Sequence, residues 1–395
     1  MAKSVSAVDL LSSADSSPPK TSLPRPTFRT RPVMLLSLAL ALTPQVTATP
    51  APDWDALFDR DSGWTGADGI YSIPLDSNDG FYNMTNTRTL FVFSDTFIGN
   101  VDSTGRRATG STIINNSIAW FEPSTGPDPL AIDFWDQRKA CFEPRTSSAQ
   151  PGEFYWMKDG IAIDGLAYLF AARFESIVAR KGVVMITMDP NSQNPTNSAT
   201  QVEVPLFAPA NSQHAEITYG GAFFDNSVIA GAPNPDGYVY CYGVEEIPGN
   251  KFAVVARVPR VQFTDFNAWT FWDGANWSSD IDDSARIAER VSTEMSVTAL
   301  PNGKYVMIFM LDTLSGTIAY RLADSPEGPW GPHVGVYDAP IPPSFPNVFA
   351  YHAKAHPHLS EPGSLLVSYN VNTINFPEHL RYADIYRPRF IRLTM

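Results

Sequence analysis

The sequence predicts an all-β protein, and more specifically a five-bladed β-propeller, from two observations. The first is a pattern that recurs five times, in which a strand and a tight turn are followed by a second strand rich in aromatic and apolar residues. The second is composition: aromatic residues make up 12% of the 395 residues and charged residues only 17%, while 25 glycines and 34 prolines suit many turns. Repeated units of this kind are typical of propellers, in which each unit forms one blade.

The clearest unit lies within residues 152–173. Residues 161–163 are predicted to be a strand, Asp164-Gly165 the two-residue turn, and residues 167–171 the answering strand, because both central positions of such a turn need positive φ angles. The answering strands of the five units begin near Leu90, Ala167, Tyr238, Tyr305 and Leu365. Their spacing of about 60 to 80 residues fits one four-stranded blade with its loops.

The first strand of each unit begins where a propeller would bring five equivalent positions to its axis. These positions hold Asp68, Asp159, the pair Tyr219-Gly220, Glu294 and His356. An Asp-Gly pair also marks turns, which is the simpler explanation for any single acid. Three carboxylates and a histidine at equivalent positions nevertheless predict a site at the axis.

Residues 1–48 are predicted to be a signal or leader segment, and residues 49–395 a single domain. The apolar run 33–42 is shorter than the ~20 residues that span a bilayer, but it fits the apolar region of a secretory signal peptide. The small residues 46–48 resemble a cleavage site, and a signal anchor is the alternative. We therefore expect a secreted, extracellular protein.

The remaining elements follow in chain order. Residues 64–75 are expected to form the first inner strand, and residues 90–97 the strand that answers it. The segment 122–152 is rich in loop-forming residues and is expected to form a wall of the site. The C-terminal residues 382–393 are expected to close the ring by pairing with the first blade, which protects the edges that a propeller would otherwise expose.

Net charge and motifs exclude several functional classes. A net charge of −13 and a pI near 4.9 argue against nucleic-acid binding, which needs clustered Lys and Arg. The sequence contains no serine-hydrolase elbow, phosphate-binding loop, dinucleotide fingerprint or zinc-protease motif. We expect a monomer that acts on a glycan, with no nucleic-acid partner and no membrane contact after leader removal.

Two kinds of residue bear on processing. Cys141 and Cys241 would form one disulfide in an oxidising compartment, and two buried thiols are the alternative. Three triplets, at Asn83, Asn115 and Asn276, are N-glycosylation acceptors in a secreted protein and predict a glycoprotein.

The carboxylates predict the chemistry. Hydrolysis of a glycosidic bond uses one protonated carboxyl that donates to the leaving oxygen and one ionised carboxylate that activates water or attacks the sugar. We expect Glu294 as the acid, Asp68 as the base or nucleophile, and Asp159 as a residue that tunes or positions them. Asp95 competes with Asp68, because it ends an apolar strand, with turn capping as its simpler explanation.

Further residues are expected to bind substrate. Trp156 lies next to Asp159 and offers a stacking surface for a sugar ring. Asp95, Tyr219 and His356 are the other candidates on strand ends. Arg173 would bind an anionic group, with a surface salt bridge as the alternative.

The histidines and cysteines predict no metal site. His352, His356 and His358 cluster in the sequence, but their spacing matches no zinc motif, and we interpret His352 and His358 as core residues. No cofactor is expected, and a structural cation in the central channel is the alternative.

Several stretches resemble a known family: GWTGADGIYSIPL with TLFVFSDTFIG, FYWMKDGIAIDGLAYLFA, YGGAFFDN with DGYVYCYGV, STEMSV, and AKAHPHLS with LLVSYNVN. Together they cover most of residues 64–372 and resemble the propeller family that includes the glycoside hydrolase family 183 endo-D-arabinanases and their relatives. The resemblance implies a five-bladed propeller with an acidic axial site that acts on a furanose-containing glycan. Asp68, Asp159 and Glu294 stand where that family's strand-head acids would be.

The sequence as a whole predicts a secreted glycoside hydrolase that cleaves a furanose-containing or related glycan. A non-catalytic carbohydrate-binding propeller, in which the acids hold sugar hydroxyls or an ion, is the alternative. A scaffold or interaction propeller is a third hypothesis.

Overall fold

The fold was analysed in a computed structural model of the chain, which describes residues 46–81, 88–122, 128, 130–341, 344–361 and 363–395. These residues belong to one compact unit, 44–395, and the other unit, 1–43, lies outside the described residues. The predicted apolar leader run and the glycosylation triplet at Asn83 therefore also lie outside them. None of the helices in the described ranges has the length and apolar character needed to cross a bilayer.

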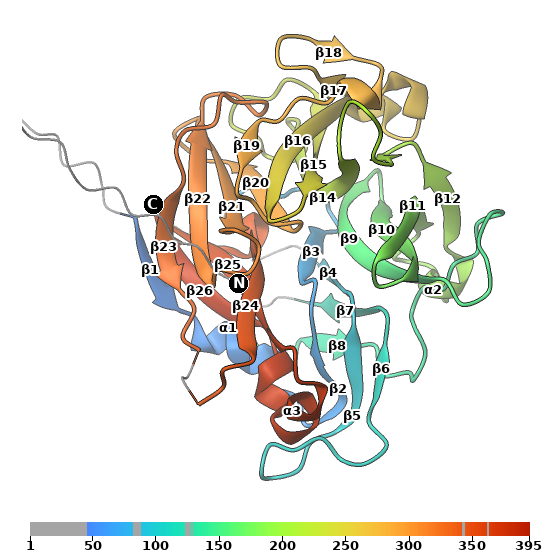
Figure 1. Cartoon of the computed structure of the whole chain (residues 1–395), viewed down its shortest axis with the longest axis vertical. Helices are drawn as coiled ribbons and strands as arrows, with labels where there is room; N and C mark the ends of the chain where they lie inside the picture. The colour runs from blue at the N-terminus through green and yellow to red at the C-terminus, as the bar shows by residue number, and fades with distance from the viewer. Residues whose placement is uncertain (1–45, 82–87, 123–127, 129, 342–343, 362) are drawn as a thin grey trace, which may run out of the picture. The chain divides into compact units, whose positions relative to one another are not determined.

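The unit is built almost entirely from antiparallel sheets, as the sequence predicts (Figure 1). The first sheet has the order β3 (Tyr71–Pro74), β4 (Thr89–Phe93), β7 (Ser117–Phe121) and β8 (Ile132–Phe134). The second has the order β9 (Phe154–Ile163), β10 (Leu166–Ser176), β11 (Ala179–Met188) and β12 (Thr200–Val204). The third has the order β13 (Phe207–Ala208), β14 (Glu216–Asn226), β15 (Tyr238–Ile247), β16 (Asn250–Pro259), β17 (Thr270–Trp272) and β18 (Trp277–Ser278), with β19 (Ala288–Glu289) also paired to β16.

Two more four-stranded sheets and one smaller sheet complete the set. The fourth has the order β20 (Met295–Ala299), β21 (Tyr305–Met310), β22 (Thr317–Ala323) and β23 (Val334–Asp338). The fifth has the order β24 (Val348–Ala355), β25 (Ser364–Thr373), β26 (Arg389–Thr394) and β1 (Thr47–Pro50). The sixth is the three-stranded sheet β2 (Ser62–Ala67), β5 (Thr96–Asn100) and β6 (Thr112–Ile114).

Short helices connect the strands, and the described residues contain three α-helices and five 3₁₀ turns. The three α-helices are α1 (Pro52–Leu57), α2 (Pro195–Ser198) and α3 (Phe376–Arg381), and each has a proline in its first turn, where the missing N–H is not needed. Five 3₁₀ turns are η1 (Arg260–Gln262), η2 (Phe266–Ala268), η3 (Ile281–Asp283), η4 (Pro357–Leu359) and η5 (Ala383–Tyr386).

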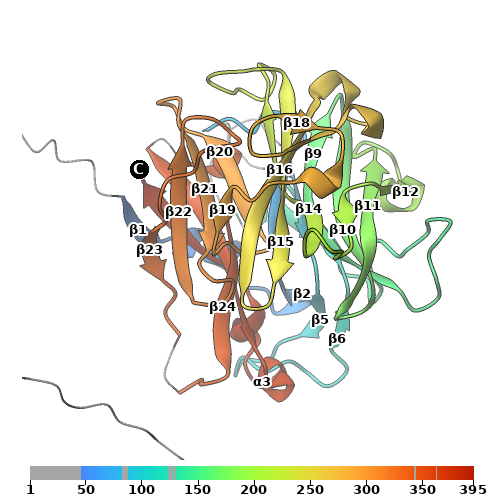
Figure 2. The same ribbon diagram turned by 45° about the horizontal axis from the view of Figure 1, so that its top comes forward.

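The arrangement is propeller-like, because the innermost strands meet in chain order. Strand β3 lies against β9, β9 against β14, β14 against β20, and β20 against β24. Figure 2 shows the yellow third sheet between the green second sheet and the orange fourth sheet.

Five buried apolar clusters fill the spaces between the sheets of the described part. Four of them join successive sheets: the first and second, the second and third, the third and fourth, and the fourth and fifth. The other brings Phe91 of the first sheet and Trp64 of the sixth into one cluster with Phe390 of the fifth. Because burial of such side chains is the main force of folding, these clusters fix each sheet to its neighbours.

The answering strands are confirmed at all five predicted positions, since β4, β10, β15, β21 and β25 each pair with the innermost strand of their sheet. The predicted strand 90–97 is divided, because β4 ends at Phe93 and the last residues belong to β5 of another sheet. The predicted inner strand 64–75 is wrong in one respect: it is divided into β2 and β3, which belong to different sheets. The strand heads are also partly wrong. Asp159 and Tyr219 lie inside β9 and β14, and His356 follows β24 instead of preceding a strand.

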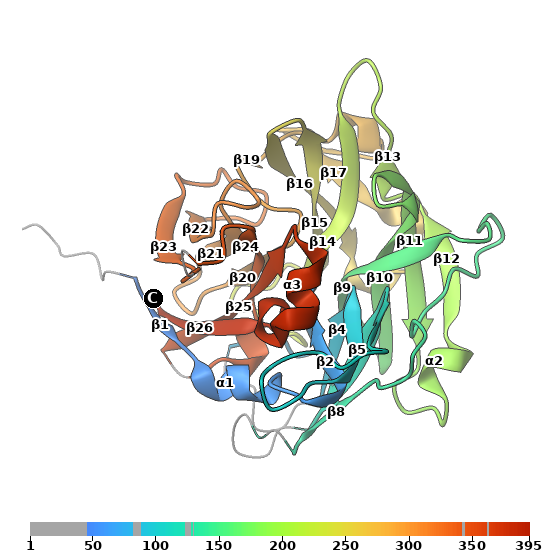
Figure 3. The same cartoon turned by 60° about the horizontal axis from the view of Figure 1, so that its bottom comes forward.

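The C-terminal strand closes the structure in a different way from that predicted. Strand β26 pairs with β1, at the beginning of the domain, and not with a strand of the first sheet. Figure 3 shows the blue β1 beside the red β26. The predicted leader boundary after Ala48 falls inside β1, where Thr47 pairs with Thr394 and Ala48 with Leu393.

Candidate active site

Two acids lie at breaks between strands of different sheets. Asp68 follows β2 and precedes β3, while Asp95 follows β4 and precedes β5. The two breaks are joined by backbone hydrogen bonds: Asp68 N–H donates to Asp95 O at 3.2 Å, and Ser94 N–H donates to Asp68 O at 2.9 Å. The chain therefore leaves one sheet for another at both points, and a carboxylate stands at each.

The side chain of Asp68 is held by two tyrosines. The hydroxyls of Tyr351 and Tyr386 donate to Asp68 Oδ2 at 2.6 and 2.9 Å, while Oδ1 is buried without a partner among the described residues. Burial, followed by the charge of Asp95, raises the pKa of Asp68 to about 8. Asp68 is thus a carboxylic acid that keeps its proton near neutral pH.

Asp95 has its own donors. Trp156 Nε1 donates to Asp95 Oδ1 at 2.9 Å, and the Asn115 side chain also hydrogen-bonds to this carboxyl. Burial raises the pKa of Asp95 to about 6, and these two hydrogen bonds oppose the shift.

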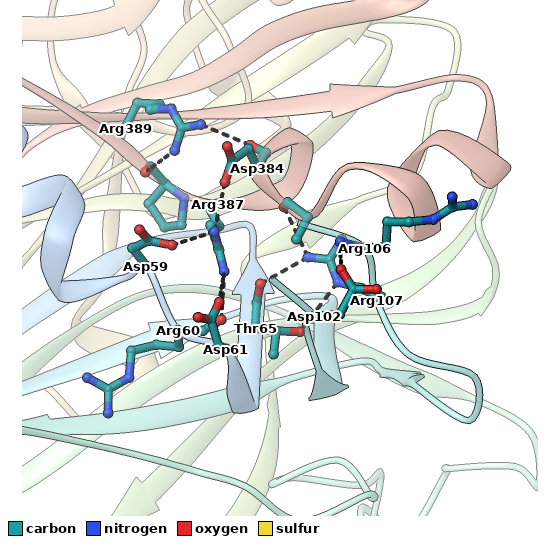
Figure 4. Close-up of polar contacts among 12 residues, drawn as sticks. Asp59, Arg60, Asp61, Thr65, Asp102, Arg106, Arg107, Asp384, Arg387 and Arg389 are labelled. Carbon is teal, nitrogen blue, oxygen red and sulfur yellow. Dashed lines mark hydrogen bonds and ion pairs between the residues drawn. The ribbon is translucent and has the colours of Figure 1, made fainter. Parts of the chain in front are cut away.

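The segment that carries Tyr386 is fixed from both sides (Figure 4). Arg387 forms ion pairs with Asp59, Asp61 and Asp384, while Arg107 Nη2 donates to Thr65 O at 2.9 Å and to Ala383 O at 3.2 Å.

Gly66 allows this segment to approach β2. Its φ angle is +154°, and a Cβ atom there would lie 2.4 Å from Tyr386 O. A glycine is therefore needed where the chain brings Tyr386 to Asp68.

Glu294 immediately precedes β20 and lies beside two residues of β24. Its Oε2 forms an ion pair with Lys354 Nζ, and its Oε1 lies 3.0 Å from His352 Nδ1. Pairing of β24 with β25 is irregular between Tyr351 and Lys354, and His352 has a φ angle of +56°. This irregularity interrupts the alternation of side chains between the two faces of the strand. As a result, Tyr351 and His352 line the pocket that contains Glu294, and Lys354 pairs with Glu294.

His352 and Lys354 both lose proton affinity through burial. Burial lowers the pKa of His352 to about 4, and it also lowers the pKa of Lys354, although Glu294 opposes both shifts. His352 is therefore neutral near pH 7, and its buried Nδ1 makes no hydrogen bond with a described residue.

Asp68, Asp95, Glu294 and Trp156 line one pocket of about 380 Å³. The apolar side of this pocket includes Phe174, whose ring centroid lies 4.7 Å from that of Trp156. The other lining residues are Tyr71, Ser94, Met157, Lys158, Ala172, Ile177, Arg180, Glu246, Lys251, Thr293, Tyr351, His352, Asn372 and Tyr386. A sugar ring in this pocket would meet carboxyl groups and an aromatic surface together.

Asp159 lies beside a second, smaller pocket of about 50 Å³, which Lys354 also lines. Its Oδ2 accepts from Phe223 N–H at 2.7 Å and its Oδ1 from Gly160 N–H at 2.8 Å. Burial raises the pKa of Asp159 to about 7, and the charge of Lys354 opposes the shift. Asp159 is therefore separated from the larger pocket but linked to it through Lys354.

Three predicted substrate-binding residues lie outside the larger pocket. Tyr219 is fully buried in the cluster between the second and third sheets, and its hydroxyl lies 2.7 Å from Ser284 Oγ. His356 is buried between Ser72 and Ser368, whose hydroxyls lie 2.7 and 2.8 Å from its ring nitrogens. Arg173 is buried and forms ion pairs with Glu153 and Glu203. It therefore takes part in salt bridges, which was the alternative to binding an anionic group of the substrate. Each of these side chains is engaged in packing or pairing in this structure, and a role for any of them in substrate binding stays a prediction.

Tyr351, Tyr386, His352, Lys354, Lys158 and Asn115 were not expected at the site. A signal existed for His352 and Lys354, since YHAKAH places polar residues within an apolar run. Nothing in the sequence marks Tyr351 or Tyr386, which reach Asp68 across 283 and 318 residues of chain.

Cys141 and Cys241 are free and buried in two different clusters. This agrees with the alternative of two buried thiols and not with a disulfide between them. Within the described ranges, no group of three His, Cys, Asp or Glu side chains is arranged to hold a metal ion.

The two described glycosylation triplets differ in one respect. The Asn115 side chain is bound to Asp95, whereas Asn276 is exposed in a turn. In a eukaryotic secretory host we expect a glycan on Asn276 and none on Asn115, as measured by peptide mass mapping before and after enzymatic deglycosylation. A glycan on Asn115 in the folded protein would contradict the contact between Asn115 and Asp95.

Comparison with known proteins gives the following matches. A model of the family described as "Domain of unknown function (DUF5005)" matches residues 52–395. No curated protein matches the chain. The crystal structure of a "putative hydrolase" from Bacteroides ovatus is similar at 17% identity and a TM-score of 0.66, with 88% of this chain and 90% of that chain covered. This match shows a shared fold.

Two other solved structures are similar at lower TM-scores. One is an alpha-L-arabinofuranosidase from Clostridium thermocellum, at 15% identity and a TM-score of 0.44, with 76% of this chain and 82% of that chain covered. The other is an alpha-L-arabinofuranosidase from Podospora anserina, at 12% identity and a TM-score of 0.45, with 84% of this chain and 98% of that chain covered.

Proposed function

The chain belongs to the family described as "Domain of unknown function (DUF5005)", and we propose that this member is a glycoside hydrolase. The observation that carries the proposal is one pocket in which a protonated carboxyl, Asp68, occurs with an ion-paired carboxylate, Glu294. Glycosidic bond cleavage uses such a pair, with the two carboxyls in different protonation states.

The roles follow from the surroundings of each carboxyl. Asp68, with its pKa raised to about 8, donates a proton to the leaving oxygen. Glu294, in contact with the Lys354 ammonium group, is the ionised carboxylate that activates water or attacks the sugar. This assignment reverses the roles predicted from the sequence, because sequence position carries no information on the burial of a carboxyl.

The neighbouring groups act as positioning residues. Asp95 raises the pKa of Asp68 through its charge, and Trp156 holds Asp95 in place. Asp159 acts through the charge of Lys354, with which it lines the smaller pocket.

The finer parts of the proposal concern fold, substrate and location. The five sheets of four or more strands support a five-bladed propeller, with the three-stranded sheet as an addition to the first blade. The resemblance to glycoside hydrolase family 183 supports a furanose-containing or related glycan as substrate. We also propose that the protein is secreted and monomeric, on the basis of its leader sequence and composition.

The test is product release from a panel of plant, fungal and bacterial glycans, arabinans included. The parent is expected to release products from at least one of them, and Asp68→Asn and Glu294→Gln are expected to lose this activity. Asp324→Asn is the matched control, because Asp324 is exposed, lies outside the pocket and is paired with Lys304. Activity that survives both pocket variants would contradict the site, and glycan binding without turnover would favour a carbohydrate-binding protein.

A further inference from the structure

The pocket that holds Asp68 and Glu294 is also lined by three cationic side chains that the proposed chemistry does not use. They are Lys158 of β9, Arg180 of β11 and Lys251 of β16. All three come from the second and third sheets, whereas Asp68 and Asp95 come from the breaks between the first and sixth sheets. The cationic side chains and these two acids therefore come from different sheets.

Two of the three cations are already paired. Arg180 forms an ion pair with Glu216. Lys251 Nζ lies 2.8 Å from Glu246 Oε1 and 2.7 Å from Thr293 Oγ1. Their charges are therefore largely balanced by protein groups.

Lys158 has no such partner among the described residues. Its side chain is 5% exposed, it lines the pocket, and neither a hydrogen bond nor an ion pair joins its ammonium group to any described residue. Buried lysines are almost always paired, because an unpaired buried charge is costly. The Lys158 amine is thus held at the pocket without a protein anion of its own.

We propose that the substrate is an anionic glycan, and that Lys158 binds the carboxylate of a uronic acid residue next to the bond that is cleaved. The inference rests on the proposed function and specifies its substrate class. One uncompensated cation matches one singly charged carboxylate better than a doubly charged phosphate. Trp156 and Phe174 supply an apolar surface in the same pocket for the sugar ring.

The titration of Lys158 gives this binding a characteristic pH dependence. Burial, followed by the charge of Arg180, lowers the pKa of Lys158 to about 7. The charged or titratable groups that face Lys158 are Arg180, Lys251, Cys241, Glu294 and His352. A bound carboxylate stabilises the ammonium form, so binding takes up a proton near pH 7 and becomes tighter as the pH falls through this value.

The experiment compares methyl β-D-glucuronoside with methyl β-D-glucoside, which differ by a carboxylate in place of a hydroxymethyl group. Isothermal titration calorimetry in two buffers of different ionisation heat measures both affinity and proton uptake. The glucuronoside is expected to bind about 10–100-fold more tightly, as a hydrogen bond to a charged group would give, and with uptake of a proton. This comparison needs no variant.

Lys158→Met is expected to remove the preference for the glucuronoside and the proton uptake. The variant should fold, because methionine removes the cost of a buried unpaired charge, and thermal unfolding checks this. Lys304→Met is the matched control, since Lys304 is exposed and outside the pocket.

Four outcomes would overturn the inference. They are equal binding of the two glycosides, no binding of either, a preference that Lys158→Met retains, and binding of inorganic phosphate or of methyl glucoside 6-sulfate in place of the glucuronoside. Failure of the proposed function is distinguishable, because glucuronoside binding without hydrolysis of any glycan would leave the anion site intact and remove only the enzymatic role.

Discussion

Asp68→Asn is expected to lower hydrolytic activity by about 10²–10⁴-fold, the usual contribution of general acid catalysis, without lowering stability at pH 8. Asparagine keeps an oxygen that accepts from Tyr351 and Tyr386, and its amide resembles the protonated carboxyl. The variant therefore removes the transferable proton but leaves the neutral form that burial favours.

The free energy of unfolding of the parent should depend on pH, and this dependence should be weaker in Asp68→Asn. The pKa of Asp68 is about 8 in the folded protein, against an ordinary value of 3.8. Between these values the folded state holds a proton that the unfolded state has released, so the free energy of unfolding falls as the pH rises. This loss begins above about pH 4 and is complete above about pH 8.

The measurement is urea unfolding of parent and variant at several pH values within this window. Asp324→Asn, on the surface, should follow the parent throughout. If Asp68→Asn shows the same pH dependence as the parent, Asp68 is not protonated in the folded protein, and the acid role fails. In the parent, kcat/KM is also expected to fall above about pH 8, as Asp68 ionises.

Lys354→Met is expected to lower the free energy of unfolding by about 3–5 kcal/mol, the usual effect of removing one partner from a buried ion pair. Lys354 is 3% exposed and Glu294 is 5% exposed, so the remaining Glu294 carboxylate would be charged, buried and without its ammonium partner. The variant also loses the contact of Lys354 Nζ with the Tyr71 ring, whose centroid lies 3.4 Å away.

A double variant separates the ion pair from simple packing. Adding Glu294→Gln to Lys354→Met removes the stranded charge and is expected to recover most of the lost stability, while activity stays absent. Denaturant unfolding of the two single variants and the double variant gives this coupling. If the double variant is as unstable as Lys354→Met alone, the loss of stability came from packing, and the ion pair with Glu294 does not contribute to the free energy of unfolding.

The sequence predicts local structure well, and contacts between distant segments less well. Alternating strands around turns such as Asp164-Gly165 mark five answering strands, because strand pattern and turn chemistry are local. The division of residues 64–75 between two sheets was missed, since nothing local distinguishes β2 from β3.

The residues of the candidate site show the same difference between local patterns and contacts of distant segments. The sequence predicts Asp68, Asp95, Trp156 and Glu294 because each stands out within its own stretch, and the fold places all four around one pocket. Tyr351 and Tyr386 were missed because their roles arise only when the fifth sheet comes beside Asp68. The irregular pairing of β24, which brings His352 and Lys354 to Glu294, likewise depends on tertiary contacts.

The pairing of β1 with β26 has a consequence for biosynthesis. A ribosome that adds roughly 5–20 residues per second needs about 17–70 s to add the ~340 residues that separate β1 from β26. During that time β1 has no partner strand, and its unpaired edge is open to other nascent chains or to chaperones. The first sheets have their strands long before the fifth, so the final step of folding in the cell is the meeting of the two ends of the domain.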